Sequence, residues 1–152
     1  MKNSISRFEW LQEYRQLDHD LKYLKWNLRK TKAELVRWVG GDLSNVSIGK
    51  NSNAAHVEEN IERIENEINW REETMKELLT LIDSFDGIEN KILVKKYIEG
   101  ETLEEMAFDA DMPYALSYIQ KKHAELKRRI EWLDDWDEIK YETQVLGGEQ
   151  LR

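Results

Sequence analysis

The fold is decided first by residues 10–38, which read WLQEYRQLDHDLKYLKWNLRKTKAELVRW. Apolar residues recur in this stretch at steps of three and four, the spacing of one apolar seam along an α-helix. The seam residues are Trp10, Tyr14, Leu17, Leu21, Leu24, Leu28, Leu35 and Trp38, with the polar Thr31 as an interruption. A helix over residues 6–39 would be roughly 50 Å long, too long for the core of a small globule. The pattern therefore predicts a coiled-coil arm.

A second heptad pattern of similar length follows a polar segment. Gly40 and Gly41 end the first pattern, and residues 42–53 have the Ser, Asn and Gly content of a connecting loop. The second seam consists of Val57, Ile61, Ile64, Ile68, Met75, Leu78, Ile82 and Phe85, with Arg71 as its polar interruption. Because neither helix can bury its seam alone, we expect residues 1–85 to form a long antiparallel helical hairpin.

Charge along the two helices supports the hairpin. Residues 4–39 contain eight basic and five acidic side chains, whereas residues 54–84 contain three basic and nine acidic ones. Side chains beside the seam would attract each other across the hairpin, while two copies of either helix would repel. The alternative is two unrelated helices in a globular bundle. Under the hairpin interpretation, residues 1–85 serve for oligomerisation or partner binding.

The composition places the chain in the all-α class. Of its 152 residues 36% are charged and 40% hydrophobic, with seven Gly and one Pro, a balance that suits long exposed helices better than sheets. The chain has no Cys, which excludes disulfides, thiolate metal sites and cysteine nucleophiles. The opening MKNSISRFEW has no signal-peptide-like apolar core and no apolar run is long enough to span a membrane, so a cytoplasmic location is expected. The net charge of −8 argues against indiscriminate nucleic-acid binding.

Shorter helical patterns follow Phe85. Residues 88–98 (IENKILVKKYI) predict a compact helix that ends at Gly100. Thr102 then begins a capping box, in which the Thr hydroxyl and a Glu carboxylate satisfy the first amides of a new helix. That helix is short, because residues 109–113 (DADMP) predict a turn. A last helix is expected from about residue 114 to at least residue 136, with residues 142–152 as a flexible tail. Its inner face consists of Ile119, Leu126, Ile130 and Leu133.

Two short helices around a tight turn, with basic residues on the second, describe a helix-turn-helix. The residues of this unit resemble region four of bacterial sigma factors, and more narrowly small regulators encoded by phages and prophages of Gram-positive bacteria. The resemblance covers residues 86–133, and it implies a compact DNA-binding helix-turn-helix within residues 86–141, double-stranded DNA as a partner, a homodimer, and the cytoplasm of a bacterial host cell. The residues that carry it are Ile92, Leu93, Tyr97, Ile98, Glu99, Gly100, Thr102, Leu103, Glu104, Glu105, Met106, Ala107, Tyr114, Ile119, Gln120, Lys121, His123 and Leu126.

The resemblance also implies roles for individual residues. The second helix would enter the major groove by its N-terminal part, where the candidates for contact with bases are Tyr114, Ala115, Ser117, Tyr118, Gln120, Lys121 and Lys122. Phosphate contacts would come from Lys127, Arg128 and Arg129 further along this helix, and from Lys95 and Lys96 on the preceding one. Ala107 would stand where the two helices cross closely. The small core beneath would contain Met106, Leu103, Ile92 and Ile119.

The turn departs from the family's usual spacing. An apolar residue is expected ten positions after Ala107, where this chain has Ser117, whereas the inward-facing residue of this helix is Ile119. Either the turn is two residues longer, with residues 109–113 absorbing the excess, or the alignment of one helix is wrong. Six acids near the presumed DNA face would also weaken phosphate attraction. They are Glu99, Glu101, Glu104, Glu105, Asp109 and Asp111.

The sequence therefore predicts a sequence-specific DNA-binding transcriptional regulator of phage or prophage origin that contacts RNA polymerase or another transcription protein. We expect no catalytic residues, metal or cofactor, because the glycine pairs fit no phosphate loop and the lone His56 and Glu59 pair has no second pair beside it. One alternative is a small terminase-like DNA-packaging protein. Another is an interaction module that binds a repressor, a sigma factor or polymerase without DNA contact. A separate alternative for the basic stripe of the last helix is the solvated face of an amphipathic helix.

The chain contains six Trp residues, a high number that packing explains best. Most are expected in seams and junctions. Trp132 and Trp136 are expected to fasten the last helix onto the base of the hairpin.

Overall fold

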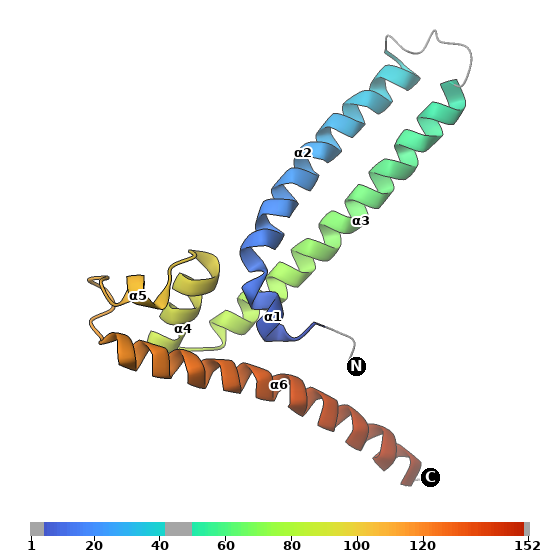
Figure 1. The fold of residues 1–152 in the computed structure, drawn as a ribbon. Coiled ribbons are helices and arrows are strands. Elements are labelled where there is room, and N and C mark those ends of the chain that lie inside the picture. Colours follow the sequence, from blue (N-terminus) through green and yellow to red (C-terminus); the bar gives the residue numbers. More distant parts are fainter. Residues whose placement is uncertain (1–4, 42–49, 151–152) are drawn as a thin grey trace. The chain divides into compact units, whose positions relative to one another are not determined.

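The computed structural model describes residues 5–41 and 50–150, and over this part of the chain it contains helices and no strand (Figure 1). The all-α class is confirmed. Two compact units divide the chain, one within residues 16–77 and the other within residues 1–15 and 78–152. The helices are α1 (Arg7–Gln12), α2 (Tyr14–Val39), α3 (Lys50–Asp83), α4 (Gly87–Leu93) with a π-helical continuation (Val94–Ile98), α5 (Leu103–Met106) and α6 (Leu116–Gln150).

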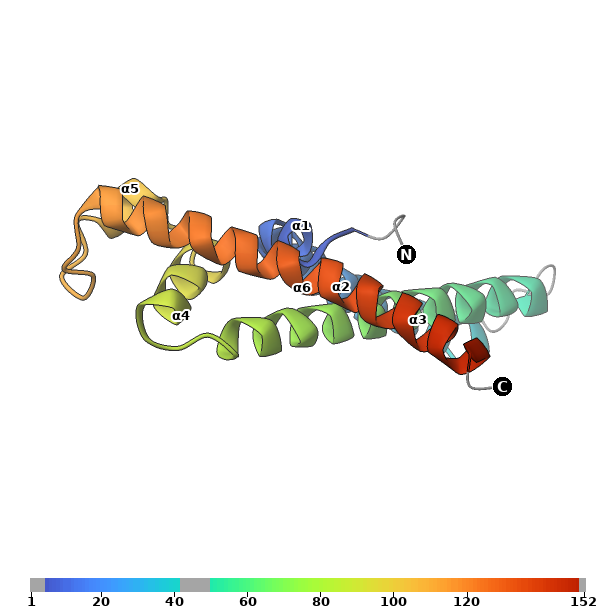
Figure 2. The ribbon, with the colours of Figure 1, turned by 90° about the horizontal axis from the view of Figure 1, so that it is seen from below.

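In the first unit, α2 and α3 pack side by side as the helical hairpin that the heptads predict (Figures 1 and 2). Of the connecting loop predicted over residues 42–53, residues 42–49 lie outside the described residues, and the prediction is wrong for residues 50–53, which belong to α3. The facing seams are less than a tenth exposed at Leu17, Leu21, Val57, Ile61, Ile64, Ile68 and Met75.

Both polar interruptions of the seams have partners. Thr31 is 5% exposed, and its hydroxyl donates to the carbonyl of Asn27 at 2.8 Å, which satisfies it inside its own helix. The guanidinium of Arg71 lies 3.6 Å from the carboxylate of Asp20 across the hairpin and 3.5 Å from Glu67 on its own helix. These two residues therefore interrupt the apolar pattern without leaving a charge or a hydroxyl unpaired.

The prediction of one continuous helix over residues 6–39 is wrong at Glu13, where the helix is interrupted. Residues before that point form the separate helix α1, which Ser6 caps by accepting the amide hydrogen of Glu9 at 3.2 Å. The reason is that α1 buries Phe8 and Leu11, neither of which belongs to the heptad seam. Their burial packs this helix against α6.

The second unit has a small core between α4, α5 and α6. Every side chain of this core is 0 to 1% exposed; the residues are Ile92, Leu93, Met106, Met112, Ile119, Leu126 and Ile130. The predicted helix over residues 88–98 is present as α4 and its π-helical continuation, and it stops before Gly100. Gly100 has φ of +81°, a left-handed conformation that glycine adopts without a steric cost.

Helix α6 differs from the prediction at both ends. It begins at Leu116 rather than near residue 114, and it continues to Gln150, so residues 142–150 extend the helix and residues 151–152 lie outside the described part. Leu133 is half-buried beside the fully buried positions of the inner face. None of the described helices combines the length and hydropathy needed to cross a membrane.

The expectation that most Trp side chains pack in seams and junctions is wrong. Trp132 and Trp136 are 57% and 46% exposed, because they project from the side of α6 away from Ile119, Leu126 and Ile130. Their rings stack on each other at 5.9 Å between centroids instead of fastening the helix. Trp26 and Trp70 are also about half exposed, at 48% and 47%. Packing in seams therefore does not account for four of the six Trp residues.

Candidate nucleic-acid interface

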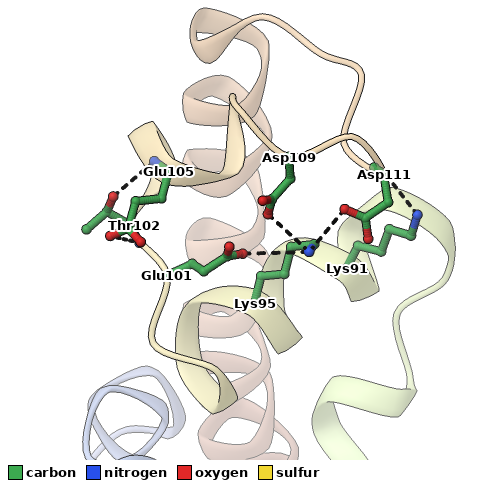
Figure 3. Close-up of polar contacts among 7 residues, drawn as sticks. All are labelled: Lys91, Lys95, Glu101, Thr102, Glu105, Asp109 and Asp111. Carbon is green, nitrogen blue, oxygen red and sulfur yellow. Dashed lines mark hydrogen bonds and ion pairs between the residues drawn. The ribbon is translucent and has the colours of Figure 1, made fainter.

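The capping box forms at the predicted position (Figure 3). The hydroxyl of Thr102 accepts the amide hydrogen of Glu105 at 3.1 Å, and the Glu105 carboxylate accepts the amide hydrogen of Thr102 at 3.4 Å. Both donors belong to the start of α5, where no helical carbonyl can reach them. The box thus sets the first residue of a helix that is only four residues long.

The connection from α5 to α6 is longer than in the usual helix-turn-helix. It covers residues 107–115, and its one buried side chain is Met112, which is 1% exposed. The Met112 amide donates to the carbonyl of Asp109 at 3.1 Å, so the chain curls around this side chain. Ile119 is fully buried and Ser117 is exposed, which supports the longer turn as the reason for the shifted apolar residue. Sequence reasoning missed Met112, whose signal was an apolar residue between Asp111 and Pro113 of the turn.

Two lysines, one in α4 and one in its π-helical continuation, bind this connection. The Nζ atom of Lys95 lies 3.2 Å from Asp109, 3.3 Å from Asp111 and 3.6 Å from Glu101 (Figure 3). The neighbouring Lys91 donates to the backbone carbonyl of Asp111 at 3.0 Å. Burial lowers the pKa of Lys95, but the hydrogen bonds and charges of Asp109 and Asp111 outweigh it, so the pKa lies above its usual range and the ammonium stays charged.

Two carboxyl groups of this cluster interact directly. The hydrogen bond between Glu101 and Asp109 raises the pKa of Glu101, as does burial of the Glu101 carboxyl. The same hydrogen bond, followed by the one from Lys95, lowers the pKa of Asp109. The pair therefore retains a proton on Glu101 more readily than an isolated glutamate would, which reduces the repulsion between the two acids.

Most of the acids near the predicted DNA face have partners within the protein. Glu101, Asp109 and Asp111 are engaged with Lys95, and Glu105 is engaged in the capping box. Four of the six acids thus have partners within the protein: three bind Lys95, and Glu105 caps α5. Lys95, a predicted phosphate contact, is only 13% exposed and its ammonium faces these carboxylates. The charge of Lys95 is therefore directed at these carboxylates and not at the exposed surface of α6.

The outward face of α6 presents Ser117, Lys121 and Arg128. These residues lie on the side of the helix opposite Ile119 and Leu126, and all three are exposed. Within the described part of the chain, neither Lys121 nor Arg128 forms an ion pair. Both cations are therefore available for contact with phosphates or base edges.

The other basic side chains of the site have intramolecular partners. Lys122 lies 3.7 Å from Glu125, Lys127 lies 3.8 Å from Glu131, and Arg129 pairs with Glu89 of α4. Three of these cations also lie over aromatic rings. The pairs are Lys122 with Tyr118, Lys127 with Phe8 and Arg129 with Phe85, and Lys96 lies similarly over Tyr97.

Exposed aromatic residues surround the first turn of α6. The rings of Tyr114 and Tyr118 stack at 5.0 Å between centroids, and these residues are 41% and 38% exposed. Phe108, in the connection from α5, is 91% exposed and was not identified from the sequence. Ala115 and Gln120 are exposed beside them. Six of the seven residues predicted to contact bases are thus exposed around the N-terminal part of α6, whereas Lys122 is half-buried and paired with Glu125.

A buried cluster positions α6 from behind. The Tyr97 hydroxyl and Nε2 of His123 are 2.7 Å apart, and the ring of Phe8 meets Tyr97 edge-on at 5.9 Å. Burial lowers the pKa of His123, as do the charges of Lys96 and Lys127, and burial raises the pKa of Tyr97. Both groups are therefore neutral near pH 7, so the cluster packs without an uncompensated charge.

Comparison with known proteins adds no identification. No protein-family model, no curated protein and no solved structure matches the chain. Within the part of the chain that the structure describes, no three His, Asp or Glu side chains are grouped so as to hold a metal ion. Function must therefore be argued from the geometry of α5, α6 and their connection.

Proposed function

We propose that this chain is a sequence-specific DNA-binding transcriptional regulator of phage or prophage origin. The observation that carries the proposal is the first part of α6, which presents Ser117 and the unpaired Lys121 beside the exposed Tyr114 and Tyr118. A capped short helix and a buried core hold this surface in a fixed geometry. The resemblance to sigma region four supports the same assignment.

In this mechanism α6 enters the major groove by its first turns. Ser117 and Lys121 can hydrogen-bond to base edges, and Arg128, two turns further on, can reach a phosphate. Because several nearby cations already have carboxylate partners, one chain neutralises few phosphates and binds weakly alone. Binding as a dimer, or together with RNA polymerase, increases the number of contacts and supplies the missing affinity.

The test is fluorescence anisotropy against DNA fragments from the encoding genome at about 50 mM and about 200 mM salt. We expect selective, salt-sensitive binding to one fragment. Lys121→Glu should weaken that binding by at least about tenfold, since it places a carboxylate against the DNA. Lys140→Glu is the matched control, because it makes the same charge change at an exposed position of the same helix. No binding at the lower salt, or equal losses in both variants, would contradict the proposal.

A second candidate function is binding to a transcription protein without DNA contact. One observation in its favour is Phe108, which is 91% exposed on the α5–α6 connection. Another is that the Lys95 ammonium is paired with carboxylates, so its charge does not face DNA. Under this proposal Phe108→Ser abolishes binding to purified RNA polymerase while circular dichroism stays unchanged, and no DNA fragment binds at about 50 mM salt.

A further inference from the structure

The C-terminal half of α6 carries an apolar stripe that the described residues do not cover. Trp132, Trp136 and Ile139 are 57%, 46% and 52% exposed, and their spacing of four and three places them on one face of the helix. The two Trp rings stack nearly parallel, at 10°, which holds them in one arrangement. Asp135 and Glu142, seven residues apart, follow one edge of this stripe, and both are exposed without an ion pair in the described chain.

Helix α2 carries a stripe of similar spacing and opposite charge on the face away from its hairpin seam. Tyr23 and Trp26 are 59% and 48% exposed, with 5.7 Å between ring centroids, and the ammonium of Lys30 lies 5.2 Å from the Trp26 ring. Lys22 and Arg29, also seven residues apart, follow one edge of this stripe. Lys22 pairs with Asp18 one turn earlier at 3.0 Å, yet its side chain remains 75% exposed.

We propose that the C-terminal half of α6 in one copy docks on this outward face of α2 in a second copy. Aromatic rings would cover each other along the centre, and Asp135 and Glu142 would face the partner's Lys22 and Arg29. Pairing α6 with another α6 would oppose these carboxylates to one another, and pairing α2 with another α2 would oppose the cations. Charge therefore selects the mixed contact. Each copy carries both stripes, so the same contact can be made in both directions between two copies.

The inference stands apart from the proposed DNA binding, since neither stripe includes the surface around Ser117 and Lys121. The experiment is sedimentation velocity of the full chain at low salt over a range of concentrations, without DNA. We expect a concentration-dependent dimer. The variant Asp135→Lys with Glu142→Lys should weaken association by at least about tenfold, and Lys22→Glu with Arg29→Glu should do the same.

Mixing the two double variants provides the decisive measurement. The first variant is basic on both stripes and the second is acidic on both, so each repels itself while the two attract each other. We expect the mixture to restore the dimer, which a contact within one chain could not do. Glu58→Lys with Glu62→Lys on α3 makes the same net charge change as the first variant at exposed positions outside both stripes, and should leave the dimer intact. A monomeric wild-type chain, or a mixture that stays monomeric, would overturn the proposal.

Discussion

Lys95 shows how one side chain can hold an irregular connection in place. Nine residues join α5 to α6, and their own hydrogen bonds form only short turns. The Lys95 ammonium binds Asp109 and Asp111 of this connection, together with Glu101, to the π-helical segment that continues α4. The position of Met112 in the core and the start of α6 follow from this arrangement.

Replacing Lys95 by Met should lower the melting temperature at pH 7, because three carboxylates lose their shared counter-charge. The pKa of Asp109 is lowered in the folded state, so its stabilising contribution is present above its unfolded pKa and is lost as the pH falls through the folded pKa. The difference between Lys95→Met and wild type should therefore shrink in acid. Lys121→Met is the control, because Lys121 is exposed and forms no ion pair with the described residues. It should leave the melting temperature unchanged both at pH 7 and in acid.

A backbone constraint acts at Gly100. Gly100 has a φ of +81°, which a residue with a Cβ adopts only at a conformational cost. An added Cβ would also lie 2.2 Å from the guanidinium of Arg15, but this group can move aside because it ends a flexible side chain. The conformational cost remains, and Gly100→Ala should destabilise the fold by about 1–2 kcal/mol in urea unfolding. Gly40→Ala is the control, since nothing lies within 4 Å of its Cβ position. Equal stability of both variants would contradict the conformational argument.

At the scale of elements, the position of α1 is the main departure from the heptad pattern. Arg7 donates its backbone amide to Asp134 at 3.1 Å, and its guanidinium pairs with Asp134 and Asp137 of α6. Phe8 packs against both Tyr97 and His123. A six-residue helix is marginal alone, so these contacts with α6 and the π-helical segment provide its stability.

Phe8→Ala should therefore destabilise the unit that contains α1 and α6 by about 3 kcal/mol, the usual cost of removing a buried aromatic ring. Phe8 is 7% exposed, whereas nearby Ile5 is 46% exposed. Ile5→Ala is the matched control, and we expect it to change the free energy of unfolding by less than about 0.5 kcal/mol. Similar values for the two variants in urea unfolding would show that α1 is not docked as described.

At the scale of the whole molecule, charge is segregated along the chain and is used differently in each segment. Residues 113–130 contain five basic and one acidic side chain, and residues 131–152 contain two and seven. Some of these charges form ion pairs with distant segments of the chain, as Arg129 does with Glu89 and Asp134 with Arg7. Others, including Lys121 and Asp135, remain exposed and available for partners.

Stability of the chain should depend on pH through His123. Its pKa is lowered by burial and by neighbouring lysines, so its contribution is present above the unfolded value of 6.5 and is lost as the pH falls through the folded pKa. The melting temperature should fall between pH 7.5 and pH 5.5 by more in wild type than in His123→Gln. The exposed His19 supplies a control, and His19→Gln should retain the wild-type dependence.

The sequence by itself determined the all-α class, the two seams, the capping box at Thr102 and the stop at Gly100, because these features depend on helical periodicity or on neighbours within a few residues. It also located the candidate DNA surface on the first turns of α6. Tertiary structure alone decided that α1 leaves the seam, that Met112 is buried, that Lys95 gathers three carboxylates, and that Trp132 and Trp136 stay exposed. It likewise decided which basic side chains of the described residues have carboxylate partners, since Arg129 pairs with Glu89, forty residues away. Such contacts join distant parts of the chain, and no local pattern encodes them.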